Sequence, residues 1–250
     1  MAILEHPLIV LLLSFIVMWI AAQIGDFTRG RLLPLESRER DDFGVVQGAT
    51  LTLLGLIIGF SFSMAISRYD QRKNYEEAEA NAIGTEFVRV DLLPADQSNK
   101  ARDLLRKYTD ARVRFYEVRD LQELAKVNSE TEQLQNELWG AVKAAASSQP
   151  TPITALAISG MNDVLNSQGY TQAAWWNRIP AAAWLLMFAI AICCNFLIGY
   201  GAHRTDRLLF VIVPLVVSIS FFLISDIDSP RGGTIRVVPQ NLIALAGALR

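Results

Sequence analysis

The chain is poor in the residues from which most catalytic and metal sites are built. Its 250 residues include two histidines, His6 and His203, and two cysteines, Cys193 and Cys194. Two histidines are too few for a zinc site with histidine ligands. The adjacent cysteines lie inside an apolar run and are most simply interpreted as small buried hydrophobic residues. No Ser-His-Asp set, glycine-rich phosphate loop or metal-type cysteine spacing is present. We therefore expect no enzyme, no cofactor and no bound metal.

Charge is also scarce. Only 19% of the residues are charged, the formal net charge is −2, and no basic patch is interleaved with aromatics. A nucleic-acid partner is therefore excluded.

What the chain has in quantity is apolar sequence, with 52% hydrophobic residues and a mean hydropathy of +0.27. These residues gather in four runs that lack Lys, Arg, Asp and Glu: residues 7–25, 43–66, 179–201 and 208–225. About 20 helical residues cross a bilayer core, and backbone in lipid favours helices. The first run has no basic residue before it and no clear cleavage site, so we expect a helix of the mature protein rather than a secretory signal. The sequence predicts a multi-pass membrane protein.

Helix-type sequence fills the region between the second and third runs. Residues 74–93 read as a helix that continues the second span without a break and leaves the bilayer near Ser67. Further helices are predicted to begin at Asp96, at a capping box formed by Ser129 and Glu132, and at Thr151. Their single apolar faces indicate an antiparallel bundle. A turn, a short extended piece and a helix from Pro239 complete the chain.

The predicted fold class is therefore all-α, with four transmembrane helices, a helical-bundle insert between the second and third, and a short extended tail plus helix. The predicted domains are a first transmembrane hairpin (1–67), an extramembrane insert (68–178), a second hairpin (179–227) and a C-terminal tail (228–250). Trp175, Trp176 and Arg178 are typical of an interfacial anchor where the insert returns to the membrane.

The basic residues of the short loops predict an orientation. Basic loops face the cytoplasm, and the N-terminal stub carries no basic side chain. The loop arginines are Arg29, Arg31, Arg38, Arg40, Arg204 and Arg207. The insert and the tail are then predicted to lie outside.

A row of small residues follows one side of the second span, at spacings of three and four: Gly44, Gly48, Thr52, Gly55, Gly59 and Ser63. Small residues let helices approach closely in lipid, so the row predicts a packing seam within or between subunits. The alternative is a pore wall, with Phe60 and Phe62 as its aromatic residues. A seam between subunits or a pore wall would each require several copies of the chain, and we expect a homo-oligomer.

Two groups of acids have competing interpretations. Asp226 and Asp228 end the fourth span, and three interpretations compete for them. They are a ring of acids at a cation-selective mouth, a Ca²⁺ site, or caps of the following turn. Glu76, Glu77 and Glu79 are interpreted as a salt-bridged helix surface, because di-iron bundles need Glu-x-x-His motifs and neither histidine lies in residues 68–178.

Four stretches resemble the bestrophin-like family of bacterial membrane proteins, a domain of unknown function: FGVVQGATLTLLGLIIGFSFSMAISRYDQR, EEAEANAIGTEFVRVDLLP, LLRKYTDARVRFYE and DIDSPRGGTIRVVPQNL. The resemblance implies a likeness to bestrophins, which are pentameric anion channels with four spans per subunit, a cytoplasmic helical region and, in animals, calcium control. It also implies that this multi-pass protein belongs to the bacterial inner (cell) membrane. The family positions matched here have no known role: Glu77, Asn81, Gly84, Leu93, Pro94, Asp228, Pro230, Gly233 and Pro239.

Two functions follow as hypotheses. The first is a passive ion channel, with lipid and ions as partners and the second span lining the axis of an oligomer. The second is a non-conducting scaffold or sensor whose insert binds a partner or ligand.

Overall fold

The computed structural model describes residues 6–31, 37–201 and 208–250, and it is helical with no strand in these ranges. The chain divides into two compact units. The first comprises Met1–Arg68 and Arg178–Arg236, and the second comprises Tyr69–Asn177 and Val237–Arg250.

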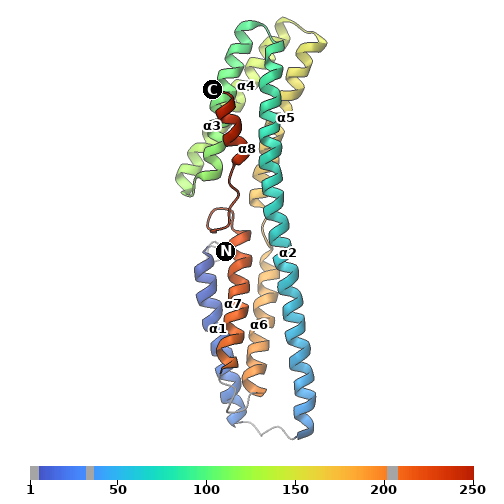
Figure 1. Ribbon diagram of the computed structural model, residues 1–250, viewed down its shortest axis with the longest axis vertical. Coiled ribbons are helices and arrows are strands. Elements are labelled where there is room, and N and C mark those ends of the chain that lie inside the picture. Colours follow the sequence, from blue (N-terminus) through green and yellow to red (C-terminus); the bar gives the residue numbers. More distant parts are fainter. Residues whose placement is uncertain (1–5, 32–36, 202–207) are drawn as a thin grey trace. The chain divides into compact units, whose positions relative to one another are not determined.

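The first unit contains the apolar helices. These are α1 (Pro7–Arg31), the first part of α2 (Ser37–Arg89), α6 (Ala181–Gly201) and α7 (Leu209–Asp228), shown in Figure 1. Among the residues that the structure describes, four stretches of helix are long and apolar enough to cross a membrane, as predicted. Helix α1 packs against both α6 and α7. Ala22, Ile198 and Phe210 form a small core, and Leu51 of α2 and Val213 of α7 pack against it.

The second unit is a helical bundle. It contains the rest of α2, a 3₁₀ turn η2 (Val90–Leu92), α3 (Ala95–Glu117), α4 (Leu121–Ser148), α5 (Pro152–Trp176) and α8 (Gln240–Ala248). Helix α3 packs on α4 and α8, and α4 packs on α5 (Figure 1). The bundle core includes Ile83, Leu105, Phe115, Leu138 and Met161, all without exposed surface. The all-α fold class with its helical insert is therefore confirmed.

Some predicted helix starts are confirmed and others are wrong. Helix α5 begins as predicted, with Thr151 in a reciprocal capping box with Thr154 and a proline in the first turn. Helix α4 begins earlier than predicted, because Asp120 accepts hydrogen bonds from the backbone N–H groups of Gln122 and Glu123, both at 2.9 Å. Ser129 therefore lies inside the helix, where the capping-box spacing has no capping role.

The start of α3 also differs from the prediction. Asp96 lies in the first turn of the helix, and Pro94 occupies the cap position without a side-chain hydrogen bond. An acid in the first turn still interacts favourably with the positive end of the helix dipole. The last helix, α8, begins after Pro239 as predicted.

Helix α2 is continuous from Ser37 to Arg89 and ends in η2 just before Leu93 and Pro94, as the absence of breakers predicted. Of the arginines that carry the predicted orientation, Arg204 and Arg207 lie outside the described residues, as do the side chains of Arg38 and Arg40. His203 lies outside them too.

Candidate functional site

The small-residue row on α2 faces away from the other described helices of the first unit. A Cβ atom added at Gly44, Gly48, Gly55 or Gly59 would meet no heavy atom within 4 Å, apart from the helix's own backbone. Thr52 and Ser63 are exposed, and Phe60 is 63% exposed. In the 18-residue apolar stretch of α2, only 17% of the residues are buried, whereas 50% are buried in the corresponding stretch of Phe210–Asp228. The row is therefore free to contact lipid or a second subunit.

A different side of α2 packs inside the first unit. Leu54, Ser61 and Ala65 are almost fully buried, with exposed fractions of 2% or less. Their spacings of seven and four residues put them on one stripe of the helix, well separated from the small-residue row.

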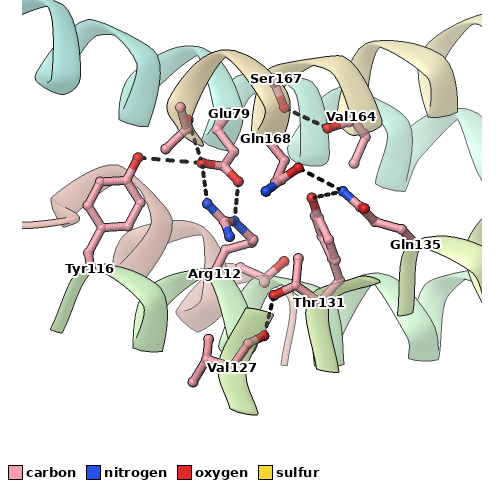
Figure 2. A network of polar contacts seen from close by, with 12 residues as sticks. Glu79, Arg112, Tyr116, Val127, Thr131, Gln135, Val164, Ser167 and Gln168 are labelled. Carbon is pink, nitrogen blue, oxygen red and sulfur yellow. Dashed lines mark hydrogen bonds and ion pairs between the residues drawn. The ribbon is translucent and has the colours of Figure 1, made fainter. Parts of the chain in front are cut away.

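A buried ion pair lies at the centre of the second unit. Glu79 of α2 and Arg112 of α3 both have fully buried side chains, and Arg112 Nε donates to Glu79 Oε1 (Figure 2). Glu79 Oε2 also accepts from Thr171 Oγ1 of α5 at 3.0 Å and from Tyr116 OH at 3.4 Å. The guanidinium of Arg112 lies over the Phe115 ring, 4.3 Å from its centroid. One carboxylate thus joins three helices.

A second set of polar contacts, beside the ion pair, involves α4. Gln135 Nε2 donates to Tyr108 OH at 3.3 Å and to Gln168 Oε1 at 3.4 Å (Figure 2). Burial, and secondarily the negative charge of Glu79, raises the pKa of Tyr108, so its hydroxyl stays protonated. The same two causes raise the pKa of Tyr116. Tyr116 therefore remains the donor to Glu79, and Tyr108 stays a neutral phenol that accepts from Gln135.

Glu76 holds the C-terminal helix. Its Oε1 accepts from the backbone N–H of Leu242 at 2.9 Å, and its Oε2 accepts from Asn241 Nδ2 at 2.7 Å. The carboxylate satisfies a free N–H group at the start of α8 and interacts favourably with the helix dipole. The sequence predicted that Glu76, Glu77 and Glu79 lie on a salt-bridged helix surface. Glu77 is exposed, but the prediction is wrong for Glu76 and Glu79, which are buried.

The other family positions on α2 differ in their surroundings. Asn81 is exposed like Glu77, whereas Gly84 lies beneath α8. A Cβ atom at Gly84 would stand 3.2 Å from Leu245 Cδ1, so a small residue lets α8 approach α2.

The paired tryptophans predicted to anchor the insert at the membrane differ in exposure. Trp175 packs edge-on against Phe115 and is buried, and Trp176 is 74% exposed.

The two aspartates at the end of α7 organise the loops of the first unit. Asp226 accepts from the N–H groups of Thr234 and Ile235 at 2.7 and 2.8 Å, and from Thr234 Oγ1 at 2.9 Å. Asp228 accepts from the N–H of Ile179 at 3.0 Å, just before α6, and lies 3.9 Å from Arg68. Both carboxylates are thus engaged in holding loop backbone.

The loop after α7 is tightly folded at the family positions. Pro230 and Gly233 are buried, and a Cβ atom at Gly233 would lie 2.1 Å from the Asp226 carbonyl oxygen. Only glycine fits this approach. Within the described residues, no group of three or more His, Cys, Asp or Glu side chains is arranged to hold a metal ion.

Two fully buried charged residues, Arg112 and Glu86, were not singled out by sequence reasoning. Arg112 follows Ala111 on the apolar face of α3, and an arginine on such a face is a signal of a buried acidic partner. Glu86 is likewise fully buried, one helical turn beyond Ile83. Its carboxylate faces Gly160 of α5.

Comparison with known proteins agrees with this architecture. A crystal structure of a bacterial bestrophin homologue from Klebsiella pneumoniae matches with a TM-score of 0.62 and 16% identity, covering 96% of this chain and 98% of that one. A point variant of that homologue matches with a TM-score of 0.62 and 12% identity, covering 96% and 93%. A crystal structure described as a membrane protein matches with a TM-score of 0.62 and 13% identity, covering 94% and 98%. No curated protein sequence matches this chain.

At these identities, the likeness to solved structures shows a shared fold. The sequence itself gives the assignment, because the model of the bestrophin-like domain matches residues 9–242, which is nearly the whole chain. This protein, with its four apolar helices, belongs to the bestrophin-like family.

Proposed function

We propose that the protein is a homo-oligomeric, passive ion channel of the bacterial inner membrane, in which the first part of α2 lines a central axis. The observation that carries this proposal is the exposed small-residue row on α2. An uncovered row of glycines and hydroxyl residues in a membrane helix is expected to face another helix or water, because lipid alone gives it little packing. Family membership adds support, since bestrophins are ion channels.

The chemistry of the row fits passive conduction. Glycines leave room along the axis, and the second span carries no ionisable side chain between Phe43 and Ile66. Phe62 follows Gly55 by seven residues and Gly59 by three, so it shares the side of the row, and we propose that it forms an apolar constriction of the kind that gates by dewetting. No catalytic role is assigned to any residue.

The test is ion flux through purified protein in liposomes, with chloride and potassium gradients compared. Gly55→Leu is expected to abolish flux, because its side chain enters the space beside α2. The matched control is Ala189→Leu, which adds similar bulk at an exposed position of α6. Loss of flux in Gly55→Leu alone, in a variant that still assembles, supports the channel. Unchanged flux in Gly55→Leu removes α2 as the wall.

A second function rests on a surface groove in the insert. The groove lies between α3 and α8, has a volume of about 410 Å³, and is lined by Asp110, Val113, Arg114, Ile243, Ala246, Gly247 and Arg250. Arg250, and Arg114 in its pair with Glu130, lie beside Asp110 and an apolar floor, and this lining suits a scaffold or sensor that binds a partly apolar ligand or partner. Absence of flux under several pH and calcium conditions favours this function over the channel.

A further inference from the structure

Glu86 is an isolated carboxylate inside the insert. It lies in the last turn of α2 and has no exposed surface. Neither of its oxygens accepts a hydrogen bond from any residue that the structure describes. This distinguishes it from Glu76 and Glu79, the other buried glutamates on α2, whose oxygens are occupied by donors.

The carboxylate rests on the backbone of α5. A Cβ atom at Gly160 would lie 2.0 Å from Glu86 Oε2 and 2.7 Å from Arg89 Nη1. Gly160 therefore makes the space that the Glu86 side chain fills.

Two charged groups face Glu86, Arg89 from α2 and Asp163 from α5. They lie close to each other, with Arg89 Nη1 3.8 Å from Asp163 Oδ2. The guanidinium is therefore shared with a second acid and compensates a charge on Glu86 only in part.

A carboxylate buried without donors favours its neutral form, because burial penalises the charged form. Burial raises the pKa of Glu86 from 4.5 to about 8; the positive charge of Arg89 opposes this rise and the negative charge of Asp163 adds to it.

We propose that Glu86 is a proton-binding site of the insert, and that loss of its proton loosens the packing of α2 against Gly160 of α5. The neutral carboxyl fits the contact with the glycine backbone. The ionised carboxylate draws water or turns toward solvent, and either movement separates the two helices locally. This inference is independent of ion conduction.

The sign of the pH effect follows from proton linkage. Below about pH 4.5, Glu86 is protonated in both the folded and the unfolded chain, and its neutral form stabilises the fold fully. As pH rises to about 8, the unfolded chain releases the proton while the folded chain retains it. The stabilisation is therefore lost progressively over this window, and the contact with α5 is weakest above it.

The experiment is infrared difference spectroscopy of the full-length protein in detergent, titrated from pH 5 to pH 10. We expect a protonated-carboxyl band that disappears with a midpoint near pH 8. The band is lost in Glu86→Gln and retained in Glu77→Gln, a control at an exposed glutamate of the same helix. A band that survives in Glu86→Gln, or that is absent from the parent protein at neutral pH, overturns the proposal.

A second variant leaves Glu86 in place. Asp163→Asn removes a like charge and frees Arg89, so the midpoint is expected to fall. An unchanged midpoint assigns the titration to another group and overturns the proposal. In hydrogen exchange, residues around Gly160 are expected to lose protection from pH 6 to pH 9 beyond the intrinsic rate increase, in the parent protein but not in Glu86→Gln. Equal loss in both proteins contradicts the loosening.

Discussion

Gly199 of α6 lies directly against the backbone of Ala22 in α1. A Cβ atom at Gly199 would stand 1.9 Å from the Ala22 carbonyl oxygen, a distance at which no side chain fits. Gly25 makes the reciprocal approach, since its Cβ atom would lie 2.1 Å from the Phe196 carbonyl oxygen. The two membrane helices therefore meet backbone to backbone, as small residues permit in lipid.

Gly199→Ala is expected to destabilise the protein, because the clash is with backbone and cannot be relieved by a side-chain rotation. Overpacking of this kind costs about 1–3 kcal/mol. The measurement is the thermal unfolding midpoint of the purified protein in detergent.

Gly169→Ala in α5 is the control for this prediction. Gly169 is exposed, and a Cβ atom there meets nothing within 4 Å. This change is expected to be neutral or to stabilise the helix by up to about 1 kcal/mol. If both variants unfold alike, the close contact between α1 and α6 is not a determinant of stability.

Glu79→Gln is expected to destabilise the insert strongly, because it leaves the buried guanidinium of Arg112 without its countercharge. Breaking one side of a buried pair costs about 3–5 kcal/mol. The control is Glu130→Gln, which breaks the ion pair between Glu130 and Arg114. Both side chains of this pair are partly exposed, at 44% and 46%. That change is expected to cost about 1 kcal/mol or less. Denaturant unfolding compares the two variants, and equal losses contradict a special role for the buried pair.

The double variant Glu79→Leu with Arg112→Met separates charge from shape. Replacing both members of a buried pair with apolar residues of similar size is often neutral. We expect it to recover much of the stability that Glu79→Gln loses. A double variant less stable than Glu79→Gln means that the remaining donors, Tyr116 and Thr171, dominate.

The membrane helices and the length of α2 were predictable, because lipid permits few backbone structures and a helix continues until a breaker stops it. The partners of the charges were not. Glu79 and Arg112 are 33 residues apart in sequence, and only the docking of α3 brings them together. Glutamates occur on several sides of residues 74–93, so sequence alone does not tell buried from exposed members.

The glycines illustrate the same limit. The regular row on α2 attracts notice in the sequence, yet it contacts nothing in its own subunit. Gly25 and Gly199 show no pattern, because each belongs to a different helix and their contact depends on how α1 crosses α6. Periodicity along one helix detects a small-residue face, and it does not detect a crossing point shared by two helices.

Glu76→Ala is expected to release α8 from the insert. The change removes the acceptor for the Leu242 N–H and for Asn241, and loss of a helix cap costs about 0.5–2 kcal/mol. Hydrogen exchange over residues 240–249 measures the release directly. Glu77→Ala, its exposed neighbour, is the control and is expected to leave that protection unchanged. Equal protection in the two variants means that other contacts of α8, such as Leu249 carbonyl with Arg106, suffice.

The side of the membrane that holds the insert is a further prediction, and two arguments about it disagree. The arginines of the short loops predict that the insert lies outside. The likeness to bestrophins implies that it lies in the cytoplasm. Ser129 is exposed on α4, so a Ser129→Cys variant reports the location of the insert by its reaction with an impermeant thiol reagent.

Labelling of Ser129→Cys in intact cells is the result that the loop arginines predict, because a reagent that cannot cross the membrane reaches only external thiols. The parent protein, with Cys193 and Cys194 in α6, gives the background to subtract. Labelling that appears only after lysis contradicts the external location and assigns the insert to the cytoplasm. In that case the loop arginines lie on the outer side, and the basic residues beside the insert, including Arg68, Arg72 and Lys73, become the cytoplasmic signal.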